Sequence, residues 1–203
     1  MPTEKIKRSY RKTRYILYKE TLIDYKEHFW SFLGSFVGIG ILAYLESSQF
    51  TGSDVVYLIG SFGASSVLIY GIIQSPFSQP RNLIGGHLIS AFIGVSVNKL
   101  VPDIVYISAP LAVSLSIIFM QITKTLHPPG GATALIAVTG SAQIKALGYM
   151  YVISPVLIGV LILFLTALIF NNMTSSRSYP SHSTYHKHYH KHYHKLRKRL
   201  ARK

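Results

Sequence analysis

Charged side chains are nearly absent from the middle of this chain, and this constrains its fold more than any other feature. Between Ile41 and Asn172 only seven residues carry a charge. Charged residues make up 14% of the chain and hydrophobic residues 49%, whereas a typical soluble protein has about 25% charged residues. The basic residues gather at the ends, eight of them between Lys5 and Lys26 and nine between Arg177 and Lys203. An apolar middle between basic flanks predicts an all-α, polytopic transmembrane helical bundle.

Six segments of the middle are candidates for entering a bilayer. They cover residues 29–45, 56–73, 83–100, 105–122, 131–140 and 149–170. A helix needs about 20 apolar residues to cross, and the second segment is interrupted by small residues while the fifth is short. These two are either broken transmembrane helices, which gives six crossings, or re-entrant loops, which gives four. We favour six, because six crossings place Arg81 and Lys124 on the same side as the basic ends.

A weak internal repeat supports the six-segment arrangement. Residues 63–69 resemble residues 131–137 at an offset of 68, and the same offset carries 83–100 onto 149–170. Two repeats of three crossings must run in opposite directions through the membrane, as in many transporters. The predicted fold is therefore two inverted three-helix repeats in which the second and fifth segments are short or broken.

The two ends predict the orientation of the chain and its contacts with lipid. Residues 1–28 form a basic, amphipathic segment, residues 29–172 the membrane domain, and residues 173–203 a basic, His-rich tail that we expect to be disordered. Both crossing counts are even, so the positive-inside rule predicts a multi-pass protein of the cell membrane with both termini in the cytoplasm. Basic segments at that surface predict binding to anionic inner-leaflet lipids.

Histidines alternate with Lys or Tyr in the tail. In an extended chain they would all lie on one side, where they could hold Zn²⁺, Cu²⁺ or Ni²⁺. The alternating histidines are His186, His188, His190, His192 and His194. The interleaved lysines oppose a dication, so the alternative is a solvated polybasic tail that touches lipid. The sequence predicts no cofactor, and we do not expect nucleic acid as a partner.

Three polar, turn-forming stretches interrupt the apolar segments. Residues 60–66 read Gly-Ser-Phe-Gly-Ala-Ser-Ser, residues 75–87 contain Ser-Pro, Gln-Pro-Arg-Asn and Gly-Gly-His, and residues 124–133 contain His127-Pro128-Pro129 followed by Gly-Gly-Ala-Thr. In these motifs the chain resembles the HPP family of bacterial and plastid integral membrane proteins, closely over residues 60–138 and loosely in the flanking spans. Plant members of that family are implicated in nitrite transport, so the resemblance implies a transporter or channel for a small anion.

The residues themselves predict an anion site near the membrane midplane. Proline suits the first turn of a helix, so the fifth helix should begin near Pro129–Gly131 and is too short to cross alone. Two half-helix N-termini would then meet, and their unpaired N–H groups and positive dipole ends attract anions. The predicted substrate-binding residues are Gly63, Ala64, Ser65, Ser66, Arg81, His87, Lys124, His127, Gly130, Gly131, Ala132 and Thr133. The alternative for the small residues is close helix packing alone.

Several functional classes do not fit the sequence. No Asp or Glu lies within a predicted span, and there is no ATPase motif and no Ser-His-Asp or zinc-protease spacing, so we do not expect an enzyme. Any proton coupling would have to run through His87 or His127, since ionisable residues inside a membrane are functional by default; otherwise the protein is passive. The alternative function is a non-transporting membrane sensor or scaffold that acts through the tail. Small polytopic chains of this kind can also form homo-oligomers.

Overall fold

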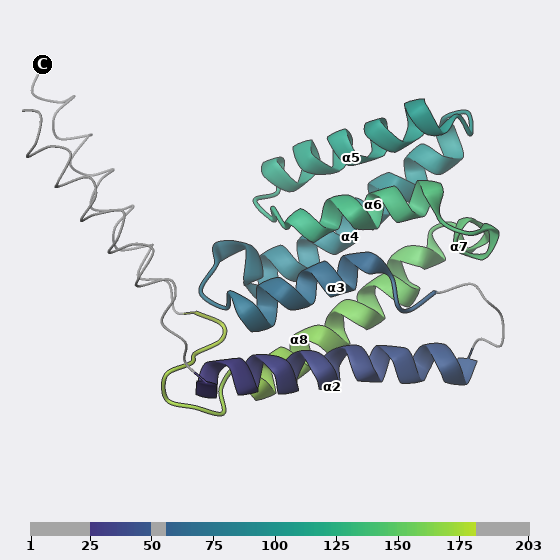
Figure 1. Ribbon diagram of the computed structural model, residues 1–203. Coiled ribbons are helices and arrows are strands. Elements are labelled where there is room, and N and C mark those ends of the chain that lie inside the picture. The colour runs from purple at the N-terminus through teal and green to yellow at the C-terminus, as the bar shows by residue number, and fades with distance from the viewer. Residues whose placement is uncertain (1–24, 50–55, 182–203) are drawn as a thin grey trace, which may run out of the picture.

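The computed structural model describes residues 25–49 and 56–181, and within these ranges all regular elements are helices (Figure 1). Four helical stretches are long and apolar enough to cross a membrane: Tyr25–Ser48, Pro80–Leu100, Val105–Ile122 and Val152–Phe170. They belong to α2 (Tyr25–Gln49), α4 (Pro80–Leu100), α5 (Val105–Ile122), and η3 (Val152–Leu157) with α8 (Ile158–Phe170). The all-α prediction is confirmed, and the count of six crossings stays a prediction. The predicted amphipathic segment before Tyr25 and the alternating histidines lie outside the described residues.

The second and fifth predicted segments form short helices. The second is α3 (Gly60–Ser66), which continues as a π-helical turn, η1 (Val67–Gly71). The fifth is α6 (Pro128–Thr139), whose 12 residues correspond to a length of roughly 18 Å. Helices α3 and α6 begin 68 residues apart (128 − 60 = 68), which is the offset of the sequence repeat. Two smaller elements, η2 (Pro76–Ser78) and α7 (Ala142–Leu147), lie in the connections.

The predicted boundaries differ from the observed ones for identifiable reasons. Helix α2 runs four residues beyond the predicted segment 29–45 at each end, because hydropathy marks the part of a helix that lies in hydrocarbon and not its last hydrogen bond. Helix α6 begins at Pro128, slightly before the predicted Pro129–Gly131, because the fixed φ of proline suits the first helical position. Helix α5 has the predicted bounds.

Helix α4 is the centre of the packing and contacts both α6 and α5, while α2 packs against α8 (Figure 1). Two glycines of α4 allow α6 to approach closely. A side chain at Gly86 would collide with the His127 Cβ and, at 2.8 Å, with the Thr125 carbonyl oxygen; one at Gly94 would come within 2.6 Å of the Ala134 carbonyl oxygen. Large apolar side chains such as Phe36 and Leu165 point outward, as expected of a surface that faces lipid.

The folded part of the chain continues beyond the predicted domain boundary at residue 172. Residues 171–181 turn back against the bundle, and Arg177 and Tyr179 are 4% and 2% exposed. The Tyr179 hydroxyl donates to the Ser78 carbonyl at 2.7 Å, and the Ser181 N–H donates to the Gln79 side chain at 2.9 Å. The first part of the predicted tail is therefore attached to the connection between η1 and α4.

Candidate functional site

Two histidines meet in the interior of the bundle. His87 lies on α4 and His127 immediately precedes α6, and both are fully buried. Their ring centroids are 4.9 Å apart. The Ser65 hydroxyl of α3 lies between them, 2.7 Å from His87 Nε2 and 2.9 Å from His127 Nε2. Residues from three separate polar stretches of the sequence thus meet at one hydroxyl oxygen.

Hydrogen bonds extend this contact at both ends. His87 Nδ1 lies 2.7 Å from the Thr133 hydroxyl of α6, and His127 Nδ1 lies 2.8 Å from the Phe77 carbonyl oxygen in η2. Ser65, His87, His127 and Thr133 are all 0% exposed. We call these four side chains, together with the Phe77 carbonyl, the histidine network.

The Phe77 carbonyl fixes the direction of the hydrogen bonds in the network. A carbonyl oxygen only accepts, so His127 Nδ1 carries a hydrogen, and in the neutral imidazole Nε2 must then accept from Ser65. The Ser65 oxygen in turn accepts from the Nε2–H of His87, whose Nδ1 accepts from Thr133. With both imidazoles neutral, all four contacts of the chain have one donor and one acceptor.

The backbone around the network explains how the two histidines come so close. Gly86 precedes His87, and Gly130 lies in the first turn of α6. A side chain at Gly130 would come within 2.7 Å of the Ser90 hydroxyl and 3.0 Å of the Gly86 carbonyl oxygen. These two glycines therefore have a packing role, which is the alternative that the sequence left open.

Of the predicted site residues, the structure brings together Ser65, His87, His127 and Thr133. Gly63 and Ala64 are exposed, and Gly131 and Ala132 are half-buried. The Ser66 hydroxyl is buried but has no hydrogen-bond partner. Two other predicted residues lie at the surface, Arg81 at the start of α4 and Lys124 just after the end of α5. Arg81 donates to the Thr123 carbonyl at 2.8 Å, and Lys124 has a positive φ.

The start of α6 supplies fewer backbone donors than the sequence predicted. Pro128 and Pro129 have no N–H, and the Gly130 N–H donates to the His127 carbonyl at 2.8 Å. The first three residues of α6 therefore present no unpaired N–H group, and the prediction of an anion site at the two helix starts stays a prediction. The positive end of the helix dipole remains.

Sequence reasoning missed three participants. The Phe77 carbonyl holds His127, the Ser61 carbonyl lies 3.0 Å from the Ser65 hydroxyl, and the Tyr151 hydroxyl donates to the Thr133 carbonyl at 3.1 Å. Every residue has a backbone carbonyl, so its role leaves no signal in the sequence. A buried Tyr in an apolar segment was the one available clue, because its hydroxyl needs a partner.

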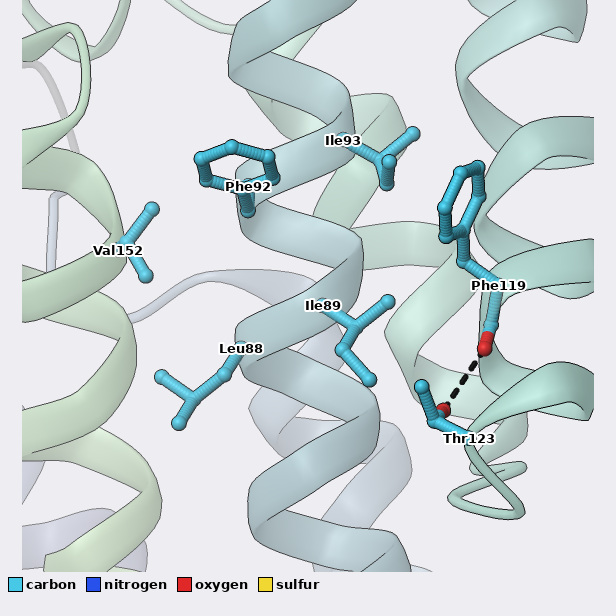
Figure 2. A pocket seen from close by; sticks show the side chains of 7 residues that line it. All are labelled: Leu88, Ile89, Phe92, Ile93, Phe119, Thr123 and Val152. Atoms are coloured by element: carbon cyan, nitrogen blue, oxygen red, sulfur yellow. Dashed lines mark hydrogen bonds between the residues drawn. The ribbon is translucent and has the colours of Figure 1, made fainter.

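An apolar cavity of about 350 Å³ lies on another part of α4, between α5 and η3 (Figure 2). Its lining residues are Leu88, Ile89, Phe92, Ile93, Phe119, Thr123 and Val152. The Thr123 hydroxyl is already bonded to the Phe119 carbonyl at 2.7 Å. No residue of the histidine network lines this cavity, and its walls suit an acyl chain better than an ion. Within the described residues no group of three or more His, Asp or Glu side chains could hold a metal ion.

Comparison with known proteins identifies the family. The family model described as the HPP transmembrane region matches residues 20–180. The chain belongs to the HPP family. Two proteins of Dictyostelium discoideum, each named a transmembrane protein, resemble this HPP-family chain. The first is 48% identical over 163 residues, which cover 77% of this chain and 56% of the relative. The second is 47% identical over 163 residues, which cover 77% of this chain and 51% of the relative. The chain thus spans about half the length of these relatives. No solved structure matches it.

Proposed function

We propose that this HPP-family protein transports a small inorganic anion such as nitrite across the membrane, and that the anion binds at the histidine network. The observation that carries the proposal is the network itself, a fully buried polar cluster inside an apolar helical bundle. Polar groups at such positions are costly and commonly mark substrate pathways. The cluster also lies where a short helix begins, as binding sites do in transporters built from discontinuous helices.

The electrostatics of the network suit an anion better than a cation. The hydrogen-bonding groups of the network are two imidazoles, two hydroxyls and a carbonyl, with no carboxylate that would repel a negative charge or hold a positive one. The positive end of the α6 dipole lies beside His127.

Burial of the whole network favours a carrier over an open pore. All four side chains are inaccessible to solvent, so an ion could reach them only after neighbouring helices move. The short helices α3 and α6 line the network from two sides, and they are the elements whose movement would open it. The described conformation then corresponds to an occluded state.

The test is anion uptake into proteoliposomes. Wild-type protein should take up nitrite with saturation, with chloride, nitrate and formate as competitors. Replacement of Thr133 by Val removes a hydroxyl that bonds His87 and should lower uptake about 10-fold. Thr139→Val is the matched control, because Thr139 lies on the same helix, is exposed, and donates its hydroxyl to the Leu135 carbonyl of that helix. Folded, inserted protein that takes up none of the four anions would refute the proposal.

Deletion of residues 182–203 separates transport from the sensor or scaffold alternative. This deletion spares Arg177 and Tyr179, which are part of the folded bundle. A transporter whose site is the histidine network should keep its uptake after the deletion. Loss of uptake from well-folded, truncated protein would instead assign an essential role to the tail.

A further inference from the structure

We propose that the histidine network binds a single proton, shared between His87 and His127, together with the transported anion, so that the anion crosses as an electroneutral pair. This rests on the proposed anion transport and names its co-substrate. The inference comes from the hydrogen-bond pattern, in which two imidazole Nε2 atoms converge on the one Ser65 hydroxyl at 2.7 and 2.9 Å.

The neutral network provides no positive charge for an anion. Its hydrogens lie on Thr133 Oγ1, His87 Nε2, Ser65 Oγ and His127 Nδ1, and each is directed at an acceptor within the network. An anion that entered this network would find no cation and no unused hydrogen. A buried anion without a partner is strongly disfavoured, so the network must gain a positive charge when the anion binds.

One added proton fits the network without movement of a heavy atom. If the proton binds His87 Nδ1, the Thr133 hydroxyl turns away and can donate to the Pro129 carbonyl, 3.4 Å from Thr133 Oγ1. The His87 Nε2–H then passes to Ser65 Oγ while the Ser65 hydrogen passes to His127 Nε2. The positive charge has now moved from one imidazole to the other, and the number of hydrogens in the network is unchanged by the transfer.

The network holds a proton and does not conduct one. A proton wire needs a group at each end that both accepts and donates, and the Phe77 carbonyl beyond His127 Nδ1 can only accept. A proton that reaches His127 must therefore leave by the way it came, or after the network opens. This favours release together with the anion over a continuous proton leak.

The surroundings favour one proton and not two. The two imidazoles face each other at 4.9 Å between centroids, so two positive charges would repel strongly in this buried position. A further titratable group in contact is Tyr151, the residue before η3, whose hydroxyl donates to the Thr133 carbonyl. From α3 the described neighbours are Phe62, Ser61 and Ser65, and from α5 Met120, all uncharged. No described contact supplies a carboxylate, so the counter-charge for the proton is the anion itself.

The first experiment measures proton and charge movement during anion uptake by the full chain in proteoliposomes. Nitrate is the most informative probe, because its conjugate acid is too strong to cross the lipid at neutral pH, and nitrite is the second probe with protein-free liposomes as control. We expect one proton to enter per anion, uptake that rises as the outside becomes more acidic, and no dependence on membrane potential. Uptake that carries one negative charge without protons would overturn the proton site and leave the anion transporter standing.

The second experiment observes the proton directly and does not depend on flux. Solid-state NMR of protein labelled with ¹⁵N-histidine should show His87 protonated at Nε2 and His127 at Nδ1 at neutral pH, identified by comparison with His87→Gln and His127→Gln; His28→Gln is the control. Addition of nitrate at mildly acidic pH should convert one imidazole of the pair to imidazolium. If neither changes, or both become charged together, the single-proton site is wrong, even in a protein that transports anions.

Discussion

Two of the buried polar clusters among the described residues are built in opposite ways. The histidine network is uncharged, has no carboxylate, and links α3, α4 and α6. The second cluster surrounds Arg177, which joins the C-terminal segment to α2 and to the end of η1. One cluster lacks a counter-charge and the other contains its own.

Arg177 is bonded through both terminal nitrogens of its guanidinium, while its buried Nε has no hydrogen-bond partner. Its guanidinium forms an ion pair with Glu27 at 3.1 Å, donates to the Tyr70 carbonyl at 2.8 Å, and donates to the Asn171 side chain at 2.7 Å. Asn171 in turn donates to the Ile69 carbonyl at 2.7 Å, so the cluster satisfies carbonyls in the last turn of η1. Burial lowers the pKa of the Arg177 guanidinium and the Glu27 carboxylate raises it; the group remains charged, as arginine does in proteins.

The difference separates structural from functional polarity. A buried charge that is paired and bonded by the protein itself stabilises one arrangement of the chain and leaves little for a ligand to do. A buried titratable pair that is satisfied only while neutral can gain a charge, and it then requires a partner from outside. The following variants test whether the two clusters differ in this way.

Of these variants, replacement of Arg177 should have the largest effect, and the quantity that changes should be the stability of the fold. Arg177→Leu removes the ion pair with Glu27 and the donor to the Tyr70 carbonyl and the Asn171 side chain, so we expect a loss of stability of about 3 kcal/mol or more. The measurement is denaturant unfolding in mixed micelles, with Arg81→Leu as the exposed control. A variant that folds normally but does not transport would show that Arg177 belongs to the functional site instead.

Removal of the bridging hydroxyl should affect transport more than folding. Ser65→Ala leaves the His127 Nε2 without a donor and the His87 Nε2–H without an acceptor, at a cost of about 1–3 kcal/mol. We expect at least about a 10-fold fall in anion uptake from protein that still inserts. Ser116→Ala is a matched control, since Ser116 is also buried and donates its hydroxyl to the Ala112 carbonyl of its own helix. Unchanged uptake in the Ser65 variant would contradict the role of the network.

The attachment of the C-terminal segment should contribute a smaller amount. Tyr179→Phe removes the hydrogen bond to the Ser78 carbonyl, next to the Phe77 carbonyl that holds His127, and should cost about 1 kcal/mol of stability. Limited proteolysis after residue 172 would report loosening of this segment. Equal protease resistance in the variant and the wild type would show that the hydroxyl is not needed for the attachment.

The surface ion pair between Lys145 and Asp103 should matter least. The atoms are 3.1 Å apart, but the side chains are 28% and 68% exposed. Asp103→Asn should change the free energy of unfolding by less than about 0.5 kcal/mol and leave anion uptake unchanged. If Asp103→Asn lowered the free energy of unfolding as much as Arg177→Leu, exposed and buried charges would contribute equally to stability, which would contradict the comparison of the two clusters.

The sequence by itself determined the all-α membrane class and the four side chains of the histidine network. Hydropathy needs no tertiary contact, because the bilayer selects apolar segments one at a time, and the prolines of the His-Pro-Pro motif set the start of α6 through their own φ. The motif stretches contained Ser65, His87, His127 and Thr133, and these residues meet in the bundle.

The tertiary structure alone decided how those residues are paired and which other motif residues have no part in the site. Gly63 and Gly131 are equivalent in the repeat, yet a side chain at Gly63 would face open space and one at Gly131 would contact the Val113 side chain of α5 at 3.8 Å, because that depends on which helix lies opposite. Arg177 looked like part of a basic tail, and only the fold showed that it lies in the bundle. The Phe77 carbonyl orients the whole network, and a backbone carbonyl acquires such a role only through the geometry of its surroundings.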